Sequence, residues 1–144
     1  MQVGPSCPGM VAGQTINGYC GLAVFTTATG TYGNRLKDVV AGTPDLLVTK
    51  SVNSSFHGSP DLDGWLRDRG AAGLVVCGIT TNHCCETTAR VGGNLGHDVL
   101  FAVDATHTFD RSGPDGDVLS ADELARATAA NLHGEFATVV KTEA

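Results

Sequence analysis

The chain has 144 residues, of which 42% are hydrophobic, and a formal net charge of -6. This size and composition predict one modest globular domain and exclude a disordered chain. Because the balance of charge is acidic and no basic cluster occurs, nucleic acid and anionic membranes are not expected as partners. No apolar run reaches the length of a membrane span, and no basic start precedes an apolar block. We therefore expect neither a transmembrane segment nor a secretory signal.

The five cysteines are odd in number. Cys77, Cys84 and Cys85 fall within a predicted buried strand and a helix start, which is not the spacing of a disulfide framework. We therefore expect reduced thiols and a cytoplasmic protein. The other two, Cys7 and Cys20, are interpreted as incidental.

The N-terminal segment, residues 1–34, differs from the rest of the chain. It is rich in Gly, Thr and other small residues and contains no Asp or Glu. Residues 22–27 could form a strand, and the remainder has the composition of loops. We therefore divide the chain into an atypical segment, 1–34, and a main domain, 35–144.

The first predicted elements of the main domain are a short strand and a helix. The strand covers residues 46–49 and ends at Lys50. Helix-start signals follow, with Ser59 as the N-cap and Pro60 at the first helical position, and Gly70 ends the helix.

A second strand, turn and helix occupy residues 74–96. The strand is expected at 74–78 and the turn at 79–83. The helix starts at Cys84 and places four residues on one face, at spacings of four, three and four, before Gly96 ends it. These residues are Cys84, Thr88, Val91 and Leu95.

The remaining elements complete an alternation of strands and helices. A strand is expected at 98–103 and a loop at 111–118. A capping box formed by Ser120 and Glu123 starts a helix that runs to about residue 132, and a last strand covers 136–141. Alternation of this kind predicts an α/β fold with a parallel sheet between helices.

Cys84 is a candidate nucleophile because it follows a strand and begins a helix. Ligands bind at the carboxyl ends of parallel strands, and a helix N-terminus favours the reactive thiolate. An inert, buried cysteine is an equally favoured alternative. Lys50 also ends a predicted strand, so it could face the same crevice and favour the thiolate. The alternative for Lys50 is a solvated surface side chain.

Metal chemistry is less favoured by the spacing of the potential ligands. These ligands are His83, Cys84, His97 and His107. No C-x₂-C or H-x₃-H pair is present, so we expect no metal and no other cofactor.

The motif Gly78-Ile-Thr-Thr-Asn-His-Cys84 is followed by Glu-Thr-Thr-Ala, and Gly96-x-x-Val and Val103-Asp-Ala come later. Together with Thr49-Lys50 and Ser54-Ser55-Phe56, this pattern resembles the isochorismatase-like cysteine hydrolases. Nicotinamidases and N-carbamoyl-amide hydrolases belong to the same superfamily. The resemblance implies a Rossmann-like three-layer α/β fold, here with the first strand missing or replaced.

The resemblance also implies roles for individual residues. Cys84 matches the nucleophile that forms a covalent thioester, and Lys50 matches the lysine of the triad. The backbone N–H groups of Thr80 and Cys84 match the oxyanion hole, which stabilises charge on the substrate oxygen. The peptide bond between Ile79 and Thr80 is often cis in this family. Cys85 stands where the family has Val or Ile, so we interpret it as a core residue.

Three further residues are candidate substrate contacts. These are Phe56 in the lysine segment, Asn82 in the turn before the cysteine, and His107 near the predicted crevice. The expected partner is a small-molecule substrate. A homo-oligomer is also expected, because a shortened sheet leaves apolar surface uncovered.

One departure from the family pattern concerns the third member of the triad. The family has an aspartate at the end of an N-terminal strand, whereas this sequence has no acid before Asp38. The N-terminal third looks truncated or replaced. Asp104 could substitute, although we expect it to orient a loop or to cap a helix. Two functions follow: an amide, carbamoyl or related hydrolase that is impaired without the aspartate, or a non-catalytic binding or assembly domain.

Overall fold

The chain folds into two compact units, Met1–Val75 and Val76–Ala144. The computed structural model describes residues 20–21, 24–26 and 45–143, with the first two segments described as backbone only. The N-terminal segment predicted at 1–34 therefore lies largely outside the described residues.

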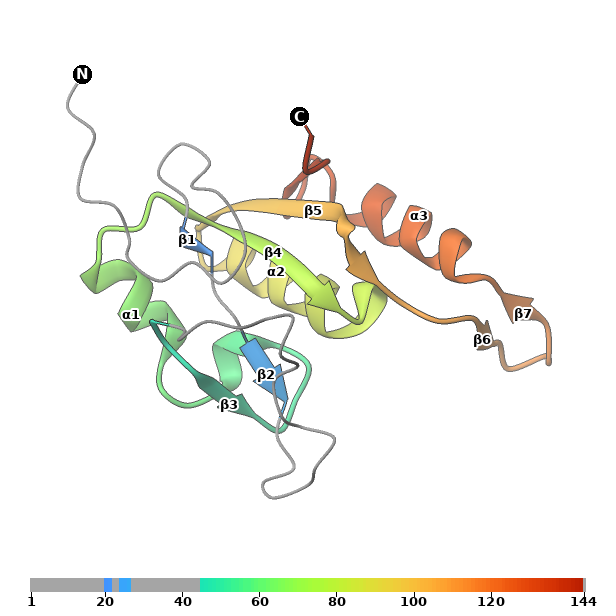
Figure 1. Ribbon diagram of the computed structural model, residues 1–144, viewed down its shortest axis with the longest axis horizontal. Helices are drawn as coiled ribbons and strands as arrows, with labels where there is room; N and C mark the ends of the chain where they lie inside the picture. Colours follow the sequence, from blue (N-terminus) through green and yellow to red (C-terminus); the bar gives the residue numbers. More distant parts are fainter. Residues whose placement is uncertain (1–19, 22–23, 27–44, 144) are drawn as a thin grey trace. The chain divides into compact units, whose positions relative to one another are not determined.

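The described part of the first unit contains short parallel strand pairs and one α-helix (Figure 1). Strand β2 pairs in parallel with β3, and β1 pairs in parallel with the beginning of β4. The elements are β1 (Cys20–Gly21), β2 (Val24–Thr26), β3 (Val48–Lys50), the 3₁₀-helix η3 (Ser55–His57), α1 (Leu62–Asp68) and the start of β4 (Gly73–Ile79). The strand predicted at 22–27 is thus described at its centre.

The core of the first unit lies between β3 and α1. Val48, Leu62 and Leu66 are completely or almost completely buried. Four partly buried apolar residues pack around them: Leu46, Phe56, Trp65 and Ala71. Burying such side chains stabilises a fold by about 1.5–3 kcal/mol each.

Helix α1 starts two residues later than predicted, because Asp61 and not Ser59 is its N-cap. The Asp61 carboxylate accepts hydrogen bonds from the backbone N–H groups of Asp63 and Gly64. Ser59 instead exchanges two backbone hydrogen bonds with Thr49 of β3, each 2.8 Å long. This bridge holds Ser59 in the sheet and delays the helix.

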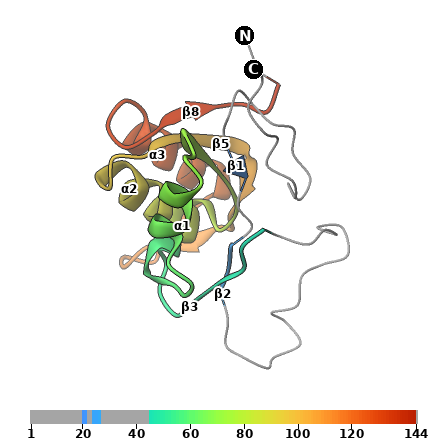
Figure 2. The ribbon, with the colours of Figure 1, turned by 90° about the vertical axis from the view of Figure 1, so that its left-hand side faces the viewer.

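The second unit is built on the parallel strands β5 and β8. β5 lies between β4 and β8, and Leu100 of β5 is in register with Thr138 of β8. The π-helical turn η4 (Thr81–Cys85) and α2 (Glu86–Asn94) follow β4. The remaining elements are β5 (Asp98–His107), β6 (Arg111–Ser112), β7 (Val118–Leu119), α3 (Ala121–Leu132) and β8 (Thr138–Val140). Helices α2 and α3 pack against each other and against β5 (Figure 2).

The buried face of α2 differs from the predicted one by about one residue. Cys85, Thr88, Ala89 and Gly92 are buried, whereas Leu95 is 39% exposed. The prediction assumed 3.6 residues per turn from Cys84 onward. A π-helical turn holds more residues than an α-helical turn, so it rotates the face that reaches the core.

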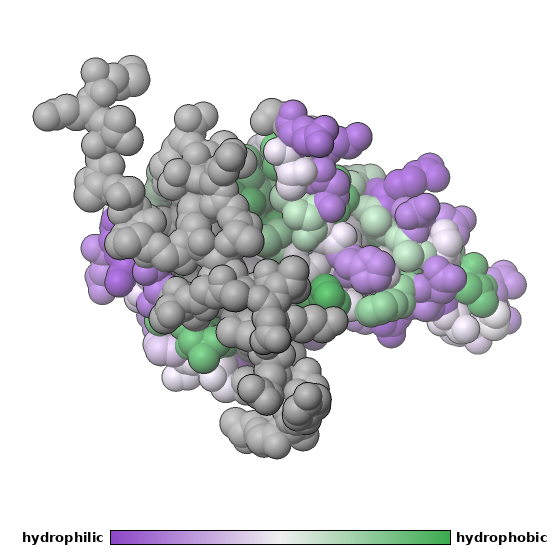
Figure 3. All heavy atoms as spheres, viewed as in Figure 1, coloured by the Kyte–Doolittle hydropathy of each residue, from purple (hydrophilic) through white to green (hydrophobic). Residues whose placement is uncertain are grey.

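The segment predicted as a loop at 111–118 forms a small antiparallel hairpin from β6 and β7. Gly113 N–H donates to Asp117 O over 2.7 Å, and Gly116 adopts a φ of +87° that favours glycine. Val118 and Leu119 are 62% and 47% exposed, and hydrophobic and hydrophilic spheres mix over this end of the unit (Figure 3).

The predicted capping residues of the second unit are confirmed, whereas β5 extends to His107 instead of residue 103 and β8 covers Thr138–Val140 instead of 136–141. Ser120 and Glu123 form a capping box at α3, and Gly96 and Gly134 have positive φ after α2 and α3. The observed strands and helices make an α/β protein with parallel strand pairs, as the alternation predicts. Within the described residues, no helix has the length and apolar character needed to cross a bilayer.

Candidate active site

The turn that carries Cys84 lies between the end of β4 and the start of α2. The Ile79–Thr80 peptide bond is cis, as the family resemblance implied. Thr80 is extended, with φ −100° and ψ 146°, and its carbonyl accepts hydrogen bonds from the N–H groups of His83 and Cys85. The chain thus closes one π-helical turn before α2 begins. Turns of this kind occur frequently at functional sites.

The two adjacent cysteines occupy different environments. Cys84 is half-buried, whereas Cys85 is 5% exposed, and neither forms a disulfide. The prediction of Cys85 as a core residue is therefore confirmed. Cys85 is buried as an inert structural cysteine would be. Cys84 is only half-buried, so it remains the candidate nucleophile.

Cys77 was expected inside a buried strand, and this prediction is wrong. Leu74 and Val76 point into the core, at 3% and 7% exposure, and Cys77 lies on the opposite, exposed face of β4. Successive side chains of a strand point to opposite faces, so Cys77 and Ile79, which is 61% exposed, lie on the face of β4 opposite Leu74 and Val76. The protein around the Cys77 thiol still displaces part of its hydration, which raises its pKa.

Threonine hydroxyls fasten η4 to the end of β5. Thr81, 1% exposed, donates its hydroxyl to Thr106 Oγ1 over 2.9 Å, and Thr106 donates in turn to the carbonyl of Val103 over 2.8 Å. Thr108 donates to Asn82 Oδ1 over 2.6 Å. Because these bonds satisfy hydroxyls that the fold largely buries, they hold the turn in one position on the strand.

Asn82 and His107 lie on neighbouring parts of this site. The oxygen of the Asn82 amide accepts from Thr108, so its remaining polar groups are N–H donors. His107 comes between the two threonines that contact η4. Its exposed ring packs edge-on against Phe109, with centroids 5.0 Å apart. The role of both residues as substrate contacts stays a prediction.

Lys50 and Phe56 belong to the first unit. Lys50 ends β3 and is 5% exposed, so the alternative of a solvated surface lysine is wrong. Its ammonium donates to the carbonyls of Val52 and Asn53 over 3.0 and 2.9 Å. Phe56 lies in η3 and packs on the core of the first unit. The pairing of Lys50 with Cys84 stays a prediction.

Asp104 holds the C-terminal segment of the second unit. Its carboxylate accepts the hydroxyl of Thr142 over 2.8 Å and the backbone N–H of Thr142 over 3.0 Å. These bonds lower the pKa of Asp104. The expectation that Asp104 orients a loop is therefore confirmed.

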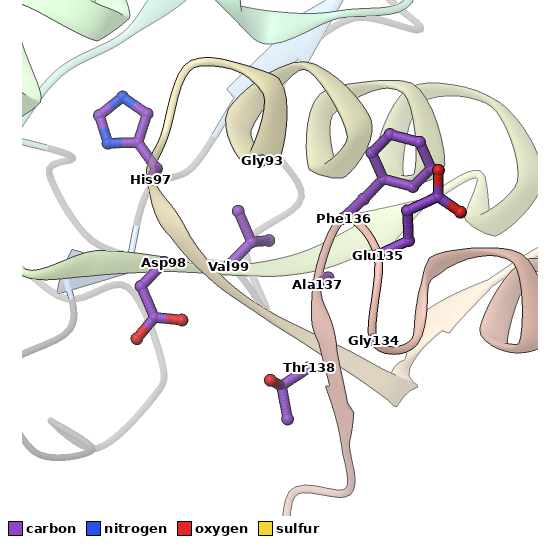
Figure 4. Close-up of a pocket in the computed structure, with 9 residues that line it drawn as sticks. All are labelled: Gly93, His97, Asp98, Val99, Gly134, Glu135, Phe136, Ala137 and Thr138. Atoms are coloured by element: carbon purple, nitrogen blue, oxygen red, sulfur yellow. The ribbon is translucent and has the colours of Figure 1, made fainter.

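The four nominal metal ligands do not form a cluster. Among the residues that the structure describes, no group of three or more His, Cys, Asp or Glu side chains could hold a metal ion. A shallow hollow of about 230 Å³ lies between the end of α2 and the start of β8, where the side chains of His97, Asp98 and Glu135 point apart (Figure 4). Cys84 does not line this hollow, so we do not assign it to the chemistry.

The hydroxyl network was not predicted from the sequence. Its signal is the number of threonines in the two segments that meet here, 80–88 and 105–108. Buried threonines need hydrogen-bond partners, so several of them near one turn indicate a polar network. The sequence does not show which hydroxyl pairs with which acceptor.

Comparison with known proteins points to one family. The family model of the isochorismatase domain matches residues 21–144. YrdC of Bacillus subtilis, an uncharacterised isochorismatase family protein, is 36% identical over 112 residues, which cover 77% of this chain and 59% of YrdC. Nicotinamidase 3 of Arabidopsis thaliana is 38% identical over 97 residues, covering 67% of this chain and 43% of the relative.

A ureidoacrylate amidohydrolase, RutB of Methylobacterium radiotolerans, is 35% identical over 113 residues, covering 78% of this chain and 40% of the relative. The crystal structure of a putative isochorismatase from Burkholderia xenovorans superposes with a TM-score of 0.76 at 32% identity, covering 83% of this chain and 61% of that one. This chain thus spans about 40–60% of the length of these three curated relatives. The chain belongs to the isochorismatase family.

Proposed function

We propose that the chain is a cysteine hydrolase of a small-molecule amide, carbamoyl or related substrate, with Cys84 as its nucleophile. The observation that carries the proposal is the half-buried thiol on a turn that side-chain hydrogen bonds fasten to β5. A reactive cysteine needs partial exposure and a fixed position, whereas a structural cysteine needs neither.

In the proposed reaction, the Cys84 thiolate attacks the carbonyl carbon of the substrate. A C–S bond forms, the C–N bond breaks, and the amine leaves with the proton that the thiol gave up. Water then attacks the thioester, which releases the acid and returns a proton to Cys84. The backbone N–H groups of Thr80 and Cys84 are proposed to stabilise the negative charge that develops on the carbonyl oxygen in both steps.

Lys50 is proposed as the group that favours the thiolate. A cation close to a thiol stabilises its charged form. The buried ammonium of Lys50 is held by two carbonyls, so its position is defined within its own unit. Phe56, Asn82 and His107 are proposed to contact the substrate. For Asn82, the oriented N–H donors suit a carbonyl or carboxylate oxygen.

The substrate class follows from the relatives. One of them is named a nicotinamidase and another a ureidoacrylate amidohydrolase, and both names describe hydrolysis of a C–N bond beside a carbonyl. The first assay is therefore release of ammonia or amine from a panel of primary amides, such as nicotinamide, and N-carbamoyl compounds. Cys84→Ala should lower turnover by roughly 10³-fold or more, because the nucleophile is lost.

Cys85→Val is the matched control for this variant. It replaces the neighbouring buried thiol by an apolar side chain of similar size, so turnover should stay within a few-fold of the original. Unchanged turnover in Cys84→Ala would contradict the proposed mechanism.

A second candidate function rests on the N-terminal sequence. The family's triad aspartate has no counterpart before Asp38, and a missing acid–base group typically lowers the rate by about 10²–10⁴-fold. A degenerate binding or assembly domain would bind amides without releasing product. Titration calorimetry with the same panel distinguishes the two, since this candidate predicts binding without turnover.

Two further properties are proposed with the enzyme. Cys77, Cys84 and Cys85 form no disulfide, which suits a reducing, cytoplasmic location. A homo-oligomer is proposed because Val118 and Leu119 on the hairpin and Phe109 beside it are exposed. Light scattering of the purified chain measures the oligomeric state directly.

A further inference from the structure

Glu86 occupies a special position in the second unit, because it is the first residue of α2 and the second after Cys84. Its backbone N–H donates to the carbonyls of Thr81 and His83, which closes the C-terminal end of η4. The same residue therefore ends the turn that carries the thiol and begins the helix behind it.

The Glu86 side chain joins this point to α3. One carboxylate oxygen accepts the hydroxyl of Thr128 over 2.7 Å. Thr128 is 1% exposed and the Glu86 side chain is 15% exposed, so water has little access to the bond. A hydroxyl that donates to an ionised carboxylate forms a strong, charge-assisted hydrogen bond.

Arg90 fixes the other carboxylate oxygen. Its guanidinium donates two hydrogen bonds to Glu86 Oε1, over 2.8 and 3.0 Å. The same guanidinium lies over the ring of Phe136, 4.7 Å from the centroid. The carboxylate is thus oriented from its own helix by Arg90 and is left with one oxygen for α3.

We propose that Glu86 and Thr128 are positioning residues for Cys84, because their bond fixes the end of η4 against α3. The threonine bonds from β5 hold the beginning of the turn, at Thr81 and Asn82, and the Glu86–Thr128 bond holds its end. Cys84 lies between the two attachments. Helix α3 also contacts η4 directly, so a change at Thr128 reaches the turn over a short path.

The consequence for catalysis rests on the function proposed above. A displacement of a reacting group by about 1 Å can lower the rate on the order of 10²-fold without changing how substrate binds. Loss of the tether should therefore reduce kcat and leave KM nearly unchanged.

The test compares Thr128→Val, Thr128→Ser and Val99→Ala by amide hydrogen exchange and by turnover. Valine keeps the volume of threonine and removes the hydroxyl, whereas serine keeps the hydroxyl. Val99 is 2% exposed near the start of β5, so Val99→Ala supplies a destabilised control without touching the tether. Exchange at the N–H groups of Cys85 and Glu86 reports the closure of η4, because both close the turn.

We expect Thr128→Val to speed exchange at Cys85 and Glu86 by roughly tenfold and to lower kcat by roughly ten- to a hundredfold. Thr128→Ser should restore the exchange rate and kcat. Val99→Ala should change neither the exchange at Cys85 and Glu86 relative to the rest of the chain nor kcat. Glu86→Gln, which keeps an acceptor for Thr128, should show a smaller effect and serves if Thr128→Val fails to fold.

If the amide exchange rates at η4 are equal in Thr128→Val and Val99→Ala, the Glu86–Thr128 bond does not hold the turn, and the proposal is wrong. Thr128→Val could also speed exchange at Cys85 and Glu86 and leave kcat unchanged, in a chain whose turnover depends on Cys84. That result would overturn the positioning role but not the tether. If Cys84→Ala keeps full turnover, the proposed function fails, but the exchange measurement still decides whether the tether exists.

Discussion

The turn η4, which carries Cys84, and the residues around Lys50 are held in place by different kinds of contact. Thr81, Asn82 and Glu86 are bonded to residues that lie 25, 26 and 42 positions away in sequence. Lys50 is bonded to carbonyls only two and three positions away. The position of the Cys84 thiol therefore depends on the folded second unit, whereas the Lys50 ammonium is held by residues that follow it closely in sequence.

This difference predicts how strongly mutations elsewhere in the chain affect each site residue. A local contact forms with little loss of chain entropy and disturbs few neighbours when it is removed. A contact between distant segments requires β5 and α3 to be in place, so changes on those elements reach the thiol. We expect remote variants to affect Cys84 more than Lys50.

Lys50→Met should have the largest effect on turnover. Under the proposed mechanism Lys50 favours the thiolate, so its loss should lower kcat/KM by about 10²–10⁴-fold. The carbonyls of Val52 and Asn53 lose their donor, which should reduce the free energy of unfolding by about 1–3 kcal/mol. Steady-state kinetics and urea denaturation measure the two quantities.

Lys50→Arg is the control, since it keeps a cation and several donors but changes their geometry. We expect it to recover part of the stability lost in Lys50→Met. Full turnover in Lys50→Met would show that the lysine has only a structural role.

Thr108→Val should have an intermediate effect and tests the long-range side of the comparison. The variant removes the donor to Asn82 Oδ1 and should reduce the free energy of unfolding by about 1 kcal/mol. Turnover should fall several-fold because the turn is less well fixed. Thr138→Val, at an exposed position on β8, is the matched control and should leave both quantities unchanged.

The smallest effect on stability is expected for Thr142→Val, because the long-range contact between Asp104 and Thr142 is exposed. The two Thr142 bonds lower the pKa of Asp104 from its usual value near 3.8. A lowered pKa means that the stabilisation is present above that usual value and is lost as the pH falls through the lower one. Thr142→Val should raise the pKa toward 3.8, which carboxyl NMR titration can measure. A pKa that does not move would show that the hydroxyl of Thr142 is not the cause, since the backbone N–H of this residue remains in the variant.

The sequence predicted the elements of the second unit well, because its signals are local. The Ser120–Glu123 capping box and Gly96 mark helix ends through their own backbone chemistry, and both are confirmed. The family motif also indicated the cis bond before Thr80 and the core position of Cys85.

The errors come from tertiary contacts that overrode local preference. A backbone bridge to Thr49 drew Ser59 away from the N-cap of α1, and Asp61 took its place. The π-helical turn rotated the buried face of α2. The exposure of Cys77 depends on what covers β4, and the Glu86–Thr128 bond joins segments 42 residues apart. None of these features has a signature within a short stretch of sequence.

The proposed mechanism requires that Cys84, and not Cys77 or Cys85, forms the covalent intermediate. The most direct measurement is acid quenching of the native chain during turnover of an amide substrate, followed by peptide mass spectrometry. We predict an acyl group on Cys84, none on Cys77 or Cys85, and none in Cys84→Ala. Turnover with an acyl group on Cys77, or with an unmodified Cys84 under conditions that trap a control thioester, would contradict the account.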